Sequence, residues 1–185
     1  MGVISEERFR ELLDARGVLR PGALAPPHRG AAFTVFAQRD HAALDLPALK
    51  SQATRFFAAK LGLTVDKRYG DALPEADAAR LVLATDDGAA SGTRLCYGRR
   101  TDPTDHAAAD DAERMQGTTG MALLAQRCGA VWLVTRESDD DRVALTIAAI
   151  LSSALLGPIL TPEGDELFGV RTARMKLEGR PRPYR

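Results

Sequence analysis

The feature that most constrains this chain is residues 143–160, which read VALTIAAILSSALLGPIL and carry no charge. A helix that is apolar nearly all round is either buried within a protein or lies in a membrane. This segment is close to the shortest length that spans a bilayer, and the charges beside it show no positive-inside asymmetry, because acids flank it on both sides. We therefore expect a buried helix. Its preceding aspartates are well placed to cap it, and they are Asp139, Asp140 and Asp141.

Short apolar and β-branched runs predict strands ahead of this helix, at residues 33–37, 80–85, 93–99 and 130–135. Helical periodicity predicts one helix over 46–61, ended by Gly62, and another between Pro103 and Cys128. The order strand, helix, strand, strand, helix, strand is that of a ferredoxin-like βαββαβ core. We therefore predict an α+β fold, an α/β sandwich with helices on one face of an antiparallel sheet. The apolar helix and a strand within 166–178 extend this core at its C-terminal side.

The pattern divides the chain into three parts. Residues 1–30 hold a short amphipathic helix over 5–16, followed by a Pro- and Gly-rich arm. Residues 31–178 form a single α/β domain, and residues 179–185 form a basic extended tail, because two prolines there prevent a helix. The N-terminal helix packs on its own domain or docks on a partner, through the apolar stripe Phe9, Leu12 and Leu13.

Composition points to few kinds of chemistry. A net charge of zero argues against a global attraction to nucleic acid or to anionic lipid. The two cysteines, Cys96 and Cys128, have no metal-ligand spacing, so we expect reduced, buried thiols. The acidic, polar first ten residues do not resemble a secretory signal, which predicts a cytoplasmic protein. The abundance of arginine and alanine suggests a GC-rich bacterium, and no motif implies a cofactor.

One cluster has a spacing that could hold a metal ion. His106 and Asp110 stand four residues apart, so they share a face of the predicted helix, and Asp102 or Asp105 could supplement them. The alternative is a solvated acidic helix N-terminus, which the helix dipole favours. If the chain binds a ligand or is a small enzyme, its site is expected near residues 86–111, between the hairpin turn and this acidic cluster.

The C-terminal segment is strongly basic. Within the predicted strand, Arg174 and Lys176 alternate with apolar residues, so both would lie on its solvent face. Such a segment could contact nucleic-acid phosphates or an acidic protein surface, or could serve only as a solubilising end. The candidate contact residues are Arg171, Arg174, Lys176, Arg180, Arg182 and Arg185.

Three functional hypotheses follow. The first is a non-catalytic cytoplasmic interaction or assembly module that self-associates through helices, because small residues of the apolar helix allow close approach of another helix. Its partner would be a second copy or another protein, and no membrane is involved. The second is a small enzyme or a ligand- or metal-binding domain with its site near residues 86–111. The third is nucleic-acid binding through the basic tail.

Overall fold

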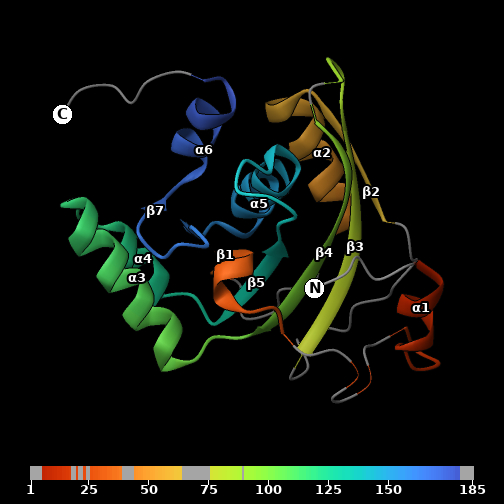
Figure 1. Ribbon diagram of the computed structural model, residues 1–185, viewed down its shortest axis with the longest axis horizontal. Coiled ribbons are helices and arrows are strands. Elements are labelled where there is room, and N and C mark those ends of the chain that lie inside the picture. The colour runs from red at the N-terminus through yellow and green to blue at the C-terminus, as the bar shows by residue number, and fades with distance from the viewer. Residues whose placement is uncertain are drawn as a thin grey trace.

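The structure of the protein is a computed structural model that describes residues 6–17, 20, 23, 26–38, 44–63, 76–88 and 90–179. The described residues form an α+β fold around one seven-stranded sheet (Figure 1). Its strands lie in the order β2-β3-β4-β5-β1-β6-β7, and each neighbouring pair is antiparallel. The strands are β1 (Ala32–Ala37), β2 (Ala59–Leu63), β3 (Ala76–Thr85), β4 (Ser91–Arg100), β5 (Ala130–Thr135), β6 (Ile159–Leu160) and β7 (Leu167–Phe168). The helices are α1 (Glu6–Glu11), α2 (Leu46–Phe57), α3 (Pro103–Gln116), α4 (Met121–Gln126), α5 (Arg142–Leu155) and α6 (Val170–Leu177), with a short 3-10 helix η1 (Arg29–Ala31).

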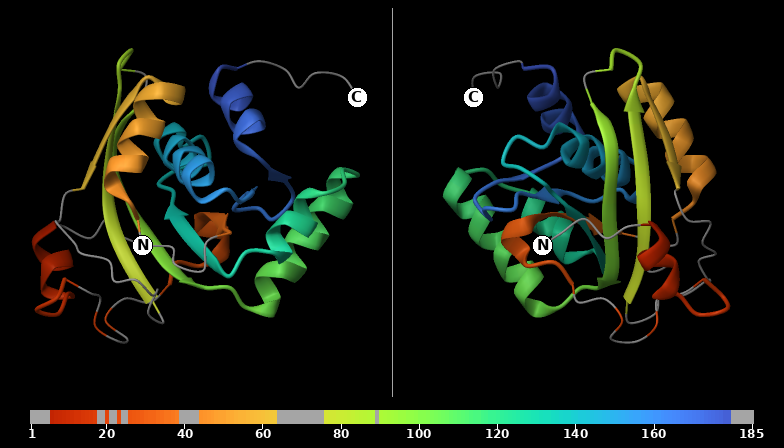
Figure 2. Two further views of the ribbon diagram at one scale, coloured as in Figure 1. Left: turned by 180° about the vertical axis from the view of Figure 1, so that it is seen from behind. Right: turned by 45° about the vertical axis from the view of Figure 1, so that its right-hand side comes forward.

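Helices cover both faces of this sheet. Side chains alternate along each strand, so on β5 Trp132 and Val134 join the core beneath α2 and α5, whereas Val131 and Leu133 join clusters on the opposite face. The first face is covered by α2, α5 and α6, and the second by α1 and the α3–α4 pair (Figures 1 and 2). Because both faces are buried, β1 is apolar or buried at every position.

The predicted α+β class and the antiparallel sheet are confirmed, but the ferredoxin-like βαββαβ topology is not. In a split βαβ unit, another strand lies between the two strands that a helix connects. Here α3 and α4 connect β4 to β5, and these two strands pair directly, for example at Gly98 and Trp132. The expectation that the helices lie on one face of the sheet is wrong for the part of the chain that the structure describes, since α1, α3 and α4 lie on the second face.

The predicted helix over 46–61 is shorter than expected. Asp45 caps it as its side chain accepts the Ala48 N–H at 3.1 Å, but the helix ends at Phe57. Ala58 has a left-handed backbone (φ 46°), and the chain turns at once into β2, which pairs with β3. Leu61 therefore lies in the core from a strand, opposite Leu83. Strand pairing outweighs the helical pattern at this end, because it satisfies a whole row of backbone groups.

The expected uncharged helix is α5, and it is buried. Asp141 caps it by accepting the Ala144 N–H at 2.9 Å, as the preceding acidic run predicted. The helix is shorter than the uncharged segment, because Leu156 adopts a left-handed backbone (φ 58°) and residues 159–160 form β6 beside β1. Among the described residues, no helix combines the length and the apolar character that crossing a bilayer requires.

The strand predicted within 166–178 is mostly wrong. Only Leu167–Phe168 form a strand, and Val170–Leu177 form α6. The segment VRTARMKL is rich in strong helix formers, and Ala173 packs fully buried on the α5 side of the sheet. Arg174 and Lys176 therefore do not alternate along a strand.

The N-terminal helix packs on the chain's own sheet. Phe9 and Leu13 are buried with Ala32, Tyr97 and Leu133, and Leu12 is half-buried beside them. Of the two alternatives, packing on its own domain is therefore the one that the structure shows for these side chains. Residue 5, at which the predicted helix begins, and residues 180–185 of the basic tail lie outside the described residues.

Candidate functional site

A hollow of the described surface lies between α2 and α6. Both helices pack on α5 from opposite sides (Figures 1 and 2). Two cavities of about 470 and 380 Å³ lie along this junction, and they share Phe56, Arg174 and Glu178. We call them together the α2–α6 groove. The side chains that line it from the three helices include Arg55, Phe56, Arg142, Arg171, Arg174, Met175 and Leu177.

The α2 wall is aromatic. Phe56 and Phe57 stand at the last turn of the helix and both are half-buried, with Phe57 packed against the main core. The Arg55 guanidinium lies 5.0 Å from the centre of the Phe56 ring, which is within the range of a cation–π contact. This wall therefore offers an apolar surface with a positive charge at its rim.

The floor, α5, is tied to both walls. The Arg142 side chain donates a hydrogen bond to the Leu177 carbonyl oxygen at the end of α6. The Ser153 hydroxyl donates to Gln52 Oε1 of α2 at 2.8 Å. These two contacts hold α2 and α6 to the same helix without bringing them together, which leaves the groove between them.

The α6 wall is basic. Arg171 is exposed at the groove, and the Arg174 guanidinium lies 3.7 Å from the Glu178 carboxylate, an exposed pair one helical turn apart. Lys176 instead forms an ion pair with Glu166 at 2.5 Å and lies over the Phe168 ring. Of the predicted C-terminal contact residues, the structure thus places Arg171 and Arg174 at the groove and Lys176 elsewhere. The remaining ones, Arg180, Arg182 and Arg185, lie outside the described residues.

The β3–β4 turn closes the other end of the groove. Asp86 and Asp87 line the larger cavity, together with Ala90. The hairpin-turn part of the site predicted near residues 86–111 therefore lines the larger cavity. The other part, the acidic cluster at 102–111, belongs to α3 on the opposite face of the sheet, so the structure does not bring the two parts together.

A buried ion pair sets the position of the groove floor. Arg94 of β4 donates from Nε to Asp141 Oδ2 at 2.7 Å and from Nη2 to Oδ1 at 2.9 Å, and both side chains are almost fully buried. The same carboxylate accepts the N–H groups of Ala144 and Glu137. Since Asp141 directly precedes Arg142, this pair also positions the arginine at the groove.

The Asp141 carboxyl has a pKa below its ordinary value. Burial raises its pKa, but the hydrogen bonds from Arg94 and from the N–H groups of Ala144 and Glu137 together outweigh burial and lower it. A depressed folded pKa means that the unfolded chain binds the proton more readily than the folded one. The carboxylate thus contributes stability above its ordinary pKa, and this contribution is lost as the pH falls.

We expect the free energy of unfolding to fall with decreasing pH once the pH drops below the ordinary Asp value of 3.8. Urea unfolding at pH values from 6 to 2, about half a pH unit apart, checks this. Asp141→Asn should be less stable at neutral pH and should show a shallower decline on acidification. An identical decline in the variant would contradict the assignment.

The predicted metal ligands do not converge. Asp102 caps α3 by accepting the Thr104 N–H at 2.8 Å, and the Thr104 side-chain hydrogen bond is the main reason that its pKa is lowered. His106 stacks on Phe36, and Asp110 accepts a hydrogen bond from Gln126 at 3.2 Å. Within the part of the chain that the structure describes, no three His, Cys, Asp or Glu side chains are grouped to hold a metal ion.

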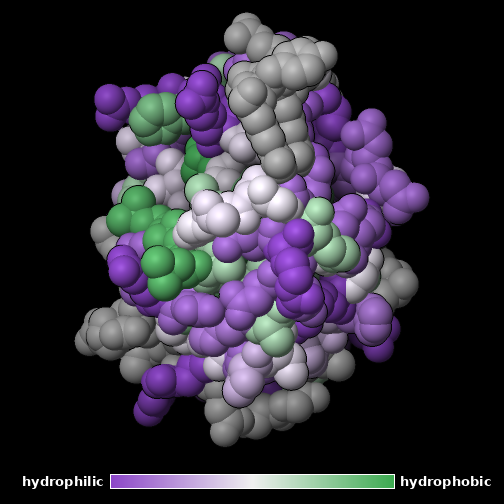
Figure 3. All heavy atoms as spheres, turned by 90° about the vertical axis from the view of Figure 1, so that its left-hand side faces the viewer, coloured by the Kyte–Doolittle hydropathy of each residue, from purple (hydrophilic) through white to green (hydrophobic). Residues whose placement is uncertain are grey.

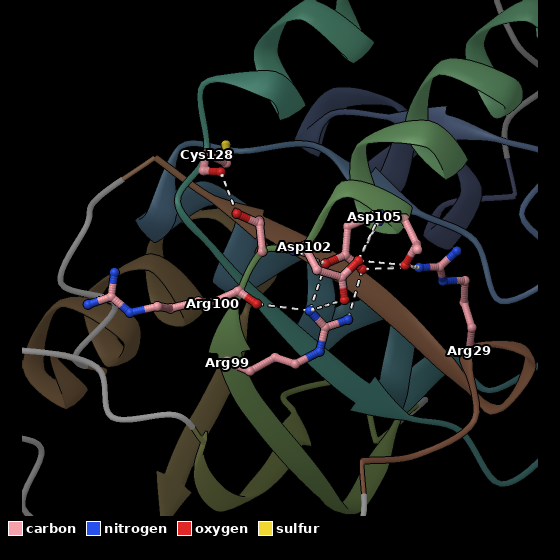
Figure 4. Close-up of polar contacts among 8 residues, drawn as sticks. Arg29, Arg99, Arg100, Asp102, Asp105 and Cys128 are labelled. Carbon is pink, nitrogen blue, oxygen red and sulfur yellow. Dashed lines mark hydrogen bonds and ion pairs between the residues drawn. The ribbon is translucent and has the colours of Figure 1, made fainter.

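Asp105 holds the N-terminus of α3 in place, and this residue is only 1% exposed. Its carboxylate accepts from Arg99 Nη1 at 2.6 Å and Nη2 at 2.8 Å, from Arg29 Nη2 at 3.1 Å, and from the Asp102 N–H at 2.9 Å (Figure 4). This carboxylate is surrounded by donors that tie α3 to β4 and to η1. Its role is therefore to anchor the helix.

Both cysteines are buried free thiols, as expected. Cys96 lies in the core beneath α5, and Cys128 lies in the cluster beneath α3 and α4, so they are on opposite faces of the sheet. Burial raises the pKa of the Cys96 thiol and raises the pKa of the Cys128 thiol to about 11. Neither thiol is ionised near neutral pH, which makes both poor nucleophiles.

No protein-family model, no curated protein and no solved structure matches this chain. The groove itself was only partly predictable from the sequence. Arg171 and Arg174 were expected as contact residues, whereas Arg55 and Arg142 were not singled out, and Phe56 stood only within the predicted helix over 46–61. The available signal is that each of these arginines stands in the first or last turn of a helix, where a long side chain reaches the surface.

Proposed function

We propose that this chain is a non-catalytic protein-interaction module of the bacterial cytoplasm that binds a segment of a partner protein in the α2–α6 groove. The observation that supports this most is that two cavities with shared lining residues lie side by side along α5, between α2 and α6. The groove offers aromatic, methionine and arginine side chains, which are the types enriched where proteins bind one another.

Self-association is the second part of this proposal. Two large apolar side chains are well exposed near the ends of adjoining helices, Met115 of α3 at 64% and Leu123 of α4 at 56%. On the side of the molecule where α3, α4 and α6 lie, hydrophobic side chains gather in one group among mostly hydrophilic ones (Figure 3). Exposed apolar surface of this kind is commonly covered by another protein.

A small-molecule site is the alternative candidate. The larger cavity, about 470 Å³, is within the usual size range of ligand pockets, and Arg55, Arg142 and Arg174 line it. Nucleic-acid binding through the tail stays a prediction, because residues 180–185 lie outside the described part of the chain. That hypothesis predicts a steep salt dependence of binding that disappears when residues 179–185 are deleted.

Site-specific photo-crosslinking in cells that naturally produce the protein tests the proposed function. A benzophenone amino acid replaces Phe56 inside the groove or, as the matched control, Lys50, which is exposed on the same helix but does not line the groove. We expect a discrete protein adduct from position 56 and none from position 50. An adduct with a second copy would identify the groove itself as a self-association surface, which sedimentation at two concentrations would verify. If position 56 yields no protein adduct, the proposed function is wrong.

A further inference from the structure

Among the described residues, helices form both walls and the floor of the α2–α6 groove, and the β3–β4 turn lies only at one end, which restricts the conformation of an occupant. Backbone N–H and C=O groups inside a helix bond to one another, so these surfaces present no row of free backbone partners to an extended peptide. The exposed carbonyl of Leu177 is already bonded to Arg142. A helix, in contrast, can pack its side chains between the ridges of neighbouring helices.

The groove also offers apolar surface on both sides. Phe56 on α2 faces the same hollow as Met175 on α6, and each is half-buried, so each retains surface that a partner could cover. Phe57 and Leu177 extend this apolar lining in the larger cavity. An occupant that fits must therefore carry an apolar face, which makes an amphipathic helix the simplest match.

The charges around the groove are not evenly distributed. The described lining has four arginines, Arg55, Arg142, Arg171 and Arg174, and three acids, of which Asp86 and Asp87 both lie in the β3–β4 turn. Among the described residues that line the smaller cavity, away from that turn, Arg171 and Arg174 meet one acid, Glu178. The α6 half of the groove is therefore basic. Arginine forks bind carboxylates in a bidentate manner, so this half is complementary to an acidic partner.

We propose that the occupant of the α2–α6 groove is an amphipathic helical segment of a partner protein, with acidic residues on its polar face. Its apolar side chains cover Phe56 and Met175, and its carboxylates lie against Arg171 and Arg174. This inference rests on the proposed function and specifies the chemistry of the partner. The partner's carboxylates therefore compete with Glu178 for Arg174, which an exposed pair one turn apart permits.

Rhodamine-labelled model peptides test this inference by fluorescence anisotropy with the full chain. One probe is an amphipathic helical peptide of leucine, alanine and glutamate; a second has lysine at every glutamate position; a third keeps the glutamates but carries two central prolines. We expect the acidic helical peptide to bind at least about tenfold more tightly than either of the other two peptides. Its binding should weaken as the salt concentration is raised.

Variants of the groove locate the binding. The double variant Arg171→Glu/Arg174→Glu is expected to lose the preference for the acidic peptide. The matched control Arg114→Glu/Arg127→Glu changes two exposed arginines on α3 and at the end of α4 and is expected to keep it. Thermal unfolding of each variant verifies that it is folded, since all four side chains are exposed.

Each other outcome has a definite meaning. Equal binding of the acidic and lysine peptides, no binding of the acidic peptide, or an equal loss in the control variant overturns the inference. If the lysine peptide binds better and Phe56→Asp abolishes that binding, the groove is an interaction site but its partner is not acidic. If the proline-containing peptide binds as tightly as the acidic helical peptide, the inference that the occupant is a helix is overturned. The proposed function itself fails only if crosslinking from position 56 yields no protein adduct.

Discussion

Replacement of Arg94 by methionine is expected to lower the free energy of unfolding by about 3–5 kcal/mol, measured by urea unfolding at pH 7. The reason is the environment of the partner carboxylate. Asp141 is almost fully buried, and Arg94 supplies two of its hydrogen bonds and its nearest positive charge. Without the guanidinium, a buried negative charge remains that two backbone N–H groups stabilise only in part.

The control is an ion pair of the same residue types on the surface. Arg114 and Asp111 form an exposed pair within α3, so Arg114→Met is expected to cost less than about 1 kcal/mol. The groove provides a second readout, because Asp141 caps α5 immediately before Arg142. We expect Arg94→Met to weaken the binding of the acidic peptide as well. A loss of stability no larger than that of the control would show that the buried Arg94–Asp141 pair does not stabilise the fold.

Replacement of Gly157 by alanine is expected to lower the free energy of unfolding by at least about 3 kcal/mol, or to prevent folding, because overpacking against backbone leaves little room to relax. A Cβ atom at this position would lie 2.0 Å from the carbonyl oxygen of Phe36 and 2.5 Å from its carbonyl carbon. β1 cannot retreat, since it pairs with β5 on one side and β6 on the other.

Gly62→Ala is the matched control for this second substitution. A Cβ atom at Gly62 in β2 would meet nothing within 4 Å. We therefore expect a change in the free energy of unfolding of less than about 1 kcal/mol, in the direction of added stability, because alanine restricts the unfolded chain more than glycine does. Thermal unfolding followed by circular dichroism compares the two variants. Equal stability of both variants would contradict the close approach of Gly157 to β1.

The elements that were predicted well are those with long, consistent apolar patterns. The strands β1 and β5 and the helix α5 each carry so many apolar residues that leaving the segment in water is unfavourable. Asp141 was predicted as a cap because aspartate before a helix bonds the free N–H groups of its first turn. These features depend on residues close together in the sequence, so local chemistry is sufficient to predict them.

The elements predicted wrongly are short segments whose conformation depends on distant partners. Residues 59–61 continue a helical pattern, but β3 offers them a ladder of backbone hydrogen bonds. Residues 170–177 alternate like a strand, but Ala173 lets them pack as a helix. For such segments the local preferences differ by only a small free energy, so tertiary contacts decide between them.

By itself, the sequence determined that an uncharged helix had to be buried at the centre of an α+β domain, because an apolar surface of that extent is strongly unfavourable in water. Only the tertiary structure decided the strand order and the groove. The arginines that line it come from α2, α5 and α6, which are far apart in the chain. Their meeting depends on how these helices pack around one another, and no local pattern contains that information.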